Sequence, residues 1–171
     1  MPEKFICGDS HCLLEDNVIF LPVSFTGLPG KITIAGCTLV LKTKFHISLV
    51  CIGKIIEKHN ISIPDFQEKI VADFCEFTKH HSIDLIRYRD EFRFVTRDED
   101  RTVVVMCEVS NLNTFFDLLN KKYALKLEHP PTHVTLYTMK PNGFISLTDP
   151  HDIEQKTKIV QVPEISNLVV R

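Results

Sequence analysis

The sequence has no tryptophan, only three tyrosines, and no long apolar run. No stretch approaches the roughly eighteen uninterrupted apolar residues of a membrane-spanning helix. The N-terminal stretch MPEKFICGDSHC also lacks a basic segment followed by an apolar run, which a secretory signal would have. We therefore expect a cytoplasmic protein with no membrane partner.

Neither sign of charge is in large excess, since the formal net charge is only -2. A phosphate backbone usually needs a basic protein surface, so this balance argues against a general binder of duplex DNA. A nucleotide or one RNA end needs only a few local cations. With 44% apolar and 25% charged residues, the composition is globular, and 171 residues suffice for one core. No linker is visible, so we expect a single domain over residues 1–171, with a monomer favoured.

The six cysteines are mostly isolated within apolar runs, as reduced buried thiols are, so we expect no disulfide framework. Cys7, His11 and Cys12 in CGDSHC form the one compact group of metal-ligand residue types. No second Cys/His pair follows downstream, as a structural zinc site would require. We therefore predict no metal and no cofactor, and a metal-binding regulatory protein built on CGDSHC is the weakest alternative.

Strand signals dominate the N-terminal part of the chain. NVIFLPVSF and KITIAGCTLVLKT are rich in β-branched and aromatic residues and are bounded by turn signals, so they predict strands leading into another at 44–52. Residues 84–109 predict a hairpin, and 132–139 predict a strand. GFISLTDP and KTKIVQV predict two short strands around a helical turn near Asp152.

Two helices are predicted from apolar residues that recur at three- and four-residue steps. One covers about 63–81, where Ser62 and Asp65 are typical of a capping box, and the other covers about 112–123. Strands and helices are interspersed with hairpins, so an α+β fold is favoured over a doubly wound sheet.

Two of the predicted strands carry a histidine and a hydroxyl residue two positions apart, in KFHISLVCI and in THVTLYT. Alternate residues of a strand share a face, so His46 and Ser48 point to one side and their apolar neighbours to the other. His133, Thr135 and Tyr137 sort in the same way. Each strand is thus predicted to present an imidazole and a hydroxyl on the face away from the helices.

A structural explanation exists for each of these residues taken alone. A single histidine on a strand is more often a hydrogen-bonded structural residue than a catalyst, and threonine favours strands in any case. His80 and Ser82 form a third match at a predicted helix end, which we interpret as accidental. The two strand matches share the same apolar context, one in each half of the chain, and this favours a shared function.

The motifs FHISL and THVTLY resemble the two apolar-His-apolar-Ser/Thr motifs of the 2H phosphoesterase superfamily. That family includes 2'-5' RNA ligase-like proteins and cyclic nucleotide phosphodiesterases. The spacing of 87 residues between the histidines and the order of elements also suit it, whereas the stretch before the first motif is longer than the minimal family pattern. The resemblance implies a bilobal, pseudo-two-fold α+β domain, in which two antiparallel β-sheets face a central groove and helices lie outside.

The resemblance also implies a function, namely metal-independent hydrolysis of a 2',3'-cyclic phosphate or a 2'-5' linkage in a nucleotide or RNA end. His133 is expected to act as base, His46 as acid, and Ser48 and Thr135 as donors to the phosphate oxygens. Tyr137 and Phe144 are candidates for lining the groove, with core packing as the alternative for both. A non-catalytic nucleotide- or RNA-binding module that keeps the fold is the alternative function.

Overall fold

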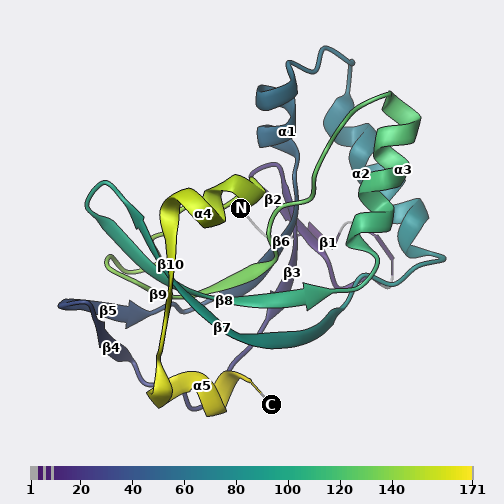
Figure 1. The fold of residues 1–171 in the computed structure, drawn as a ribbon. Helices are drawn as coiled ribbons and strands as arrows, with labels where there is room; N and C mark the ends of the chain where they lie inside the picture. Colours follow the sequence, from purple (N-terminus) through teal and green to yellow (C-terminus); the bar gives the residue numbers. More distant parts are fainter. Residues whose placement is uncertain (1–3, 6, 9, 171) are drawn as a thin grey trace.

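The computed structural model describes residues 4–5, 7–8 and 10–170, and it confirms a mixed α+β architecture (Figure 1). The strands are β1 (Lys4–Phe5), β2 (Leu13–Glu15), β3 (Val18–Val23), β4 (Lys31–Ile34), β5 (Cys37–Leu41), β6 (Phe45–Cys51), β7 (Leu85–Arg97), β8 (Asp100–Val109), β9 (His133–Thr138) and β10 (Thr157–Val160). The helices are α1 (Ile52–His59), α2 (Phe66–Thr78), α3 (Leu112–Tyr123), α4 (Pro150–Lys156) and α5 (Pro163–Val169).

Within the described residues, the strands join into one antiparallel ten-stranded sheet, where two separate sheets were expected. Its main order is β1-β2-β3-β6-β9-β8-β7-β10, and the β4–β5 hairpin is attached through β5 to β9. The two halves of the chain meet where β6 pairs with β9, which is why the sheet is continuous. This junction brings the two histidine motifs onto neighbouring strands.

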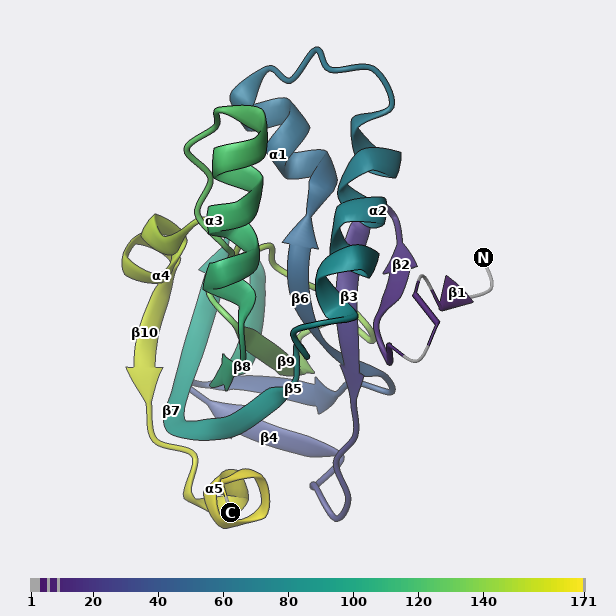
Figure 2. The ribbon, with the colours of Figure 1, turned by 90° about the vertical axis from the view of Figure 1, so that its right-hand side faces the viewer.

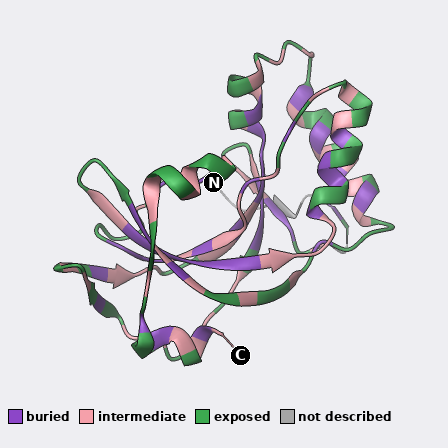
Figure 3. Ribbon diagram, viewed as in Figure 1, coloured by how far each residue is buried: buried purple, intermediate pink, exposed green. Residues whose placement is uncertain are grey.

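The main hydrophobic core lies on one face of the sheet, where α2 and α3 pack side by side (Figure 2). The rings of Phe74 in α2 and Phe115 in α3 meet edge to face with their centroids 5.3 Å apart, and both are fully buried. Figure 3 shows the buried residues gathered along the inner sides of these helices and the central strands. Burying a large apolar side chain of this kind contributes about 1.5–3 kcal/mol each, so this face anchors the sheet.

A second, smaller apolar cluster lies on the opposite face. Val95, Val104 and Met106 of β7 and β8 pack there against Ile145 and Leu147, which belong to the segment between β9 and α4. That segment ends in a capping box, in which the Asp152 carboxylate accepts from the backbone N–H of Asp149, and the Asp149 carboxylate also accepts from the backbone N–H of His151. The sheet is therefore covered by helices on one face and, at β7 and β8, by this segment on the other.

Several predicted elements are confirmed with nearly the expected bounds, including the hairpin of β7 and β8, strand β9 and helix α3. GFISLTDP forms no strand, whereas the helical turn near Asp152 is α4. KITIAGCTLVLKT divides into β4 and β5, because Ala35 and Gly36 both adopt positive φ and form a tight turn.

The capping box predicted at Ser62 and Asp65 is wrong. Asp65 is the residue before α2, but it adopts the left-handed conformation and its side chain makes no capping hydrogen bond. Helices α1 and α5 were not predicted. Helix α1 follows β6 directly, and its N-cap residue Cys51 makes no side-chain capping hydrogen bond, so no capping signal in the sequence marks where the strand ends and the helix begins.

No disulfide framework was expected, but one disulfide is present between Cys7 and Cys75, and it joins the N-terminal segment to α2. Their Cα atoms lie 5.0 Å apart although 68 positions separate them in the sequence, and only the tertiary fold brings them within bonding reach.

Among the described residues, which exclude Asp9 of CGDSHC, no group of three or more potential metal ligands occurs. None of the helices in the described part of the chain has the length and apolar character needed to cross a membrane.

Candidate functional site

The two histidine motifs lie side by side, because β6 and β9 are antiparallel neighbours with Ile47 opposite Val134. Both of these residues are fully buried in the main core beneath the helices. Continuing the register by one residue in each direction places Ser48 beside His133 and His46 beside Thr135. Alternate residues point to opposite faces, so all four of these side chains point away from that core.

The four predicted residues meet in one small pocket, which His46, Ser48, His133, Thr135 and Lys42 line together. All five are partly buried, so the pocket opens to solvent while its walls are held in the sheet. Ser48 and Thr135 make no side-chain hydrogen bond to another described residue. Their hydroxyls are therefore available to a ligand in the pocket.

His133 is held in one tautomer by the chain that precedes it. Its Nδ1 lies 2.6 Å from the carbonyl oxygen of Pro131, and a carbonyl can only accept, so Nδ1 carries the proton. Burial lowers the pKa of His133, and the nearby charge of Lys42 lowers it further, against the opposing effect of the Pro131 hydrogen bond. The ring is then neutral near pH 7, with its lone pair on Nε2, which is the state a general base requires.

His46 is positioned by strand β3, which pairs with β6 on the side away from β9. The rings of His46 and Phe20 lie with their centroids 5.0 Å apart in a tilted arrangement. Phe20 lies opposite Ser48 and Pro22 lies opposite His46 in the strand register. The buried Phe20 ring thus forms an apolar support on one side of the imidazole.

Lys42 is the pocket residue that the sequence did not reveal. Its backbone N–H donates to the carbonyl oxygen of Leu136 at 2.9 Å, which ties the residue to β9 beside the pocket. Burial lowers the pKa of its amino group, because the charged form is less well solvated there. A lysine four positions before a histidine carries no recognisable pattern, so only the fold could identify it.

Tyr137 does not line the pocket, and the alternative of core packing is the one that applies to it. In the pairing of β8 with β9, Val104 lies opposite Thr135 but Val103 lies opposite Tyr137, so Leu136 is an extra residue in a β-bulge. The bulge breaks the alternation and turns Tyr137 toward the main core, where it is 0% exposed. Its hydroxyl donates to the carbonyl oxygen of Pro29 at 2.8 Å.

Phe144 also lies outside the set of residues that line the pocket. It belongs to the segment between β9 and α4, and 66% of its surface is exposed, so the alternative of core packing is wrong for this residue. The apolar anchors of that segment are Ile145 and Leu147 instead.

Comparison with known proteins does not identify a family. No protein-family model matches the chain, and no curated protein or solved structure matches it significantly. The function is therefore inferred from the site and from the motif resemblance.

Proposed function

We propose that this protein is a metal-independent phosphodiesterase that hydrolyses a 2',3'-cyclic phosphate or a 2'-5' linkage of a nucleotide or RNA end. The observation that supports it best is the single pocket lined by both histidines, both hydroxyls and a lysine. The two His-x-hydroxyl motifs that resemble the 2H phosphoesterases supply four of these five residues. A lysine in the same pocket suits an anionic substrate, because it offsets the charge of a phosphate.

In the proposed mechanism, Nε2 of His133 removes a proton from the attacking water, whose oxygen bonds to phosphorus. The bond between phosphorus and one ribose oxygen breaks, and His46 gives its proton to that oxygen. Ser48 and Thr135 donate hydrogen bonds to the non-bridging oxygens, while Lys42 offsets the charge that develops on them. The lowered pKa of His133 and its Nδ1 hydrogen bond support the assignment of this histidine as the base.

The proposal includes the bilobal, pseudo-two-fold arrangement that the resemblance implies. The related units would be the antiparallel pairs β3–β6 and β8–β9, since each carries one motif on the strand nearest the junction. The β6–β9 pairing would then be the seam between the lobes.

A substrate panel in the presence of a chelator tests the proposal. The purified protein is incubated with the four 2',3'-cyclic nucleotides and with 2'-5'-linked and 3'-5'-linked oligonucleotides, with and without EDTA, and products are separated by chromatography. The control is the double variant His46→Ala/His133→Ala, which reports any contaminating activity. We expect turnover of a cyclic phosphate or a 2'-5' linkage that EDTA does not affect and that the double variant lacks.

Two other outcomes would contradict the proposal. Turnover abolished by EDTA would assign the chemistry to a metal ion. Nucleotide binding without turnover of any substrate would favour the non-catalytic binding module.

A further inference from the structure

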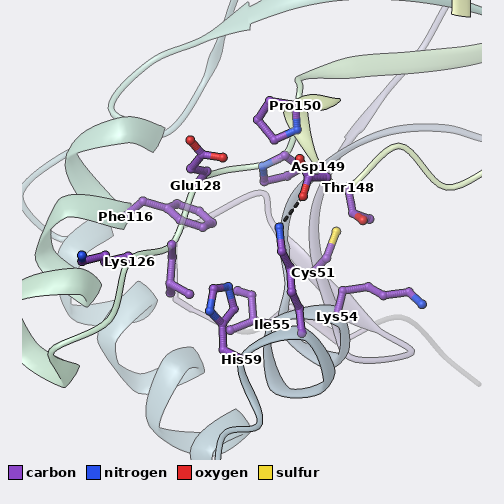
Figure 4. A pocket seen from close by; sticks show the side chains of 13 residues that line it. Cys51, Lys54, Ile55, His59, Phe116, Lys126, Glu128, Thr148, Asp149 and Pro150 are labelled. Atoms are coloured by element: carbon purple, nitrogen blue, oxygen red, sulfur yellow. Dashed lines mark hydrogen bonds and ion pairs between the residues drawn. The ribbon is translucent and has the colours of Figure 1, made fainter. Parts of the chain in front are cut away.

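A second, larger pocket lies beyond the end of β6, bounded by α1, by the segment that follows α3 and by the start of α4 (Figure 4). Cys51, Lys54, Lys58 and Lys126 are among its lining residues. It is distinct from the histidine pocket, because the two share no lining residue.

The two pockets are neighbours along the same two strands. In β6, Ser48 lines the histidine pocket and Cys51 lines the second pocket. Likewise His133, the first residue of β9, lines the histidine pocket, and Pro130 in the preceding segment lines the second pocket. Each pair is three residues apart, which spans at most about 10 Å at 3.3 Å per residue of extended chain, and the bulge at Leu49 shortens this span in β6. A stacked nucleic-acid strand rises about 3.4 Å per nucleotide, so two or three nucleotides cover this distance.

A bulge in β6 places Cys51 on the same face as the histidine site. Ile19 lies opposite Val50 whereas Phe20 lies opposite Ser48, so Leu49 is an extra residue in β6. The alternation therefore shifts by one position, and Cys51 follows Ser48 on its face of the sheet although the sequence spacing predicts the reverse.

The second pocket has an excess of positive charge. Its lining includes three lysines and two carboxylates, Glu128 and Asp149. Asp149 is already engaged by the Lys58 amino group, in an ion pair marked by the dashed line to Asp149 in Figure 4, and by the backbone N–H of His151.

The lysines that remain for a ligand are Lys54 and Lys126. Lys54 is exposed and makes one surface ion pair with Glu57 at 3.3 Å. Lys126 is exposed and forms no ion pair or hydrogen bond with another described residue. These two exposed amino groups lie on opposite sides of the pocket, one on α1 and one on the segment after α3 (Figure 4). Each can therefore contact a different phosphate of one strand that passes over the pocket.

From this arrangement we infer that the second pocket binds the phosphodiesters next to the reacting one, so that the substrate is a single-stranded RNA of several nucleotides. This rests on the proposed function, because it takes the histidine pocket as the site of the terminal phosphate. Lys54 and Lys126 contact the adjacent phosphates, and a free cyclic nucleotide leaves the second pocket empty.

Binding of product-like ligands tests this without requiring turnover. Isothermal titration calorimetry compares a nucleoside 3'-monophosphate with an RNA tetranucleotide that ends in the same nucleotide and a 3'-phosphate. The proteins are the wild type, Lys54→Ala/Lys126→Ala, and Lys31→Ala as an exposed lysine on β4 outside both pockets.

We expect the wild type and Lys31→Ala to bind the tetranucleotide about tenfold more tightly than the monophosphate, as two surface contacts of this kind allow. The double variant should lose that difference while binding the monophosphate as the wild type does. Its slope of log affinity against log salt for the tetranucleotide should be shallower by about 1.4, since each lost phosphate contact removes about 0.7.

The outcomes separate this inference from the proposed function. Equal affinities of the wild type for the two ligands, or an undiminished tetranucleotide affinity in the double variant, would overturn the inference even if the enzyme turns over cyclic nucleotides. Length-dependent binding that the double variant loses, without turnover of any substrate, would overturn only the proposed function. Failure of both ligands to bind would overturn both.

Discussion

Ile47 of β6 lies opposite Val134 of β9, and both are fully buried beneath the helices. Because alternate residues of a strand point to opposite faces, the residues before and after Ile47 and Val134 point to the face away from the helices. The two histidines, 87 positions apart in the chain, therefore line the same pocket. The hydrophobic core thus fixes the geometry of the polar site, because the inner residues of the two strands set the register of the outer ones.

Replacing either hydroxyl residue should slow the reaction. Ser48 and Thr135 are proposed to donate to the phosphate oxygens, and loss of one such donor typically costs about 10²-fold in rate. Ser48→Ala and Thr135→Val should each lower kcat/KM for a 2',3'-cyclic nucleotide by about this factor, with an unchanged circular dichroism spectrum. Less than a twofold change in both variants would remove the hydroxyls from the mechanism.

The control for these variants is Thr102→Val, which makes its own prediction. Thr102 is buried on the same sheet, and its hydroxyl has no hydrogen-bond partner in the described part of the chain. An unsatisfied buried hydroxyl is unfavourable, so Thr102→Val should raise the free energy of unfolding by up to about 1 kcal/mol and leave kcat/KM unchanged. Urea unfolding measures this. Destabilisation by the valine would indicate that the hydroxyl has a partner after all.

Tyr137→Phe distinguishes a core residue from one that lines the site. The substitution removes the hydrogen bond to the Pro29 carbonyl and should lower the free energy of unfolding by about 1 kcal/mol. Activity on a cyclic nucleotide should stay within twofold of the wild type, since the ring lies on the far side of β9. A large loss of activity without loss of stability would place Tyr137 at the site and contradict the bulge.

The pKa of His133 should respond to Lys42. Burial and the Lys42 charge hold this pKa below 6.5, so removing the charge in Lys42→Gln should raise it. NMR titration of the imidazole measures the pKa directly, and the acidic limb of the kcat/KM profile should move to higher pH with it. Lys31→Gln, outside the pocket, should leave both unchanged.

The same shift has a consequence for stability. The folded state binds fewer protons than the unfolded state between the lowered pKa of His133 and 6.5. The free energy of unfolding therefore rises with pH through this window. The stability that comes from keeping His133 neutral is fully present above pH 6.5 and is lost as the pH falls from 6.5 through the lowered pKa. Urea unfolding of Lys42→Gln should show a weaker loss over this range than the wild type does. An identical pH dependence, together with an unshifted titration of His133, would show that the lysine charge does not reach the ring.

Sequence patterns predicted most of the fold and four of the five pocket residues, because both depend on local periodicity. His46, Ser48, His133 and Thr135 follow from the two-residue repeat of a strand. The orientation of Tyr137 does not follow from this repeat, because Leu136 is an extra residue in the pairing of β8 with β9. No local sequence pattern predicts such a bulge.

Long-range contacts account for the remaining differences. Lys42 is held beside the pocket by its backbone hydrogen bond to Leu136, and Cys75 in α2 lies within bonding reach of Cys7, 68 positions away in the sequence. Residues far apart in the chain determine both relationships, so no local sequence pattern could predict them.

The central claim is that two histidines act on one phosphate. Initial rates of 2',3'-cyclic nucleotide opening in EDTA test it most directly, for the wild type, His46→Ala, His133→Ala and His80→Ala. His80 belongs to the third His-x-Ser match, and its exposed ring lies outside both pockets, so it is the matched control. Each pocket variant should lose about 10²–10⁴-fold in rate, while His80→Ala keeps the wild-type rate. Full activity in either pocket variant would contradict the two-histidine mechanism.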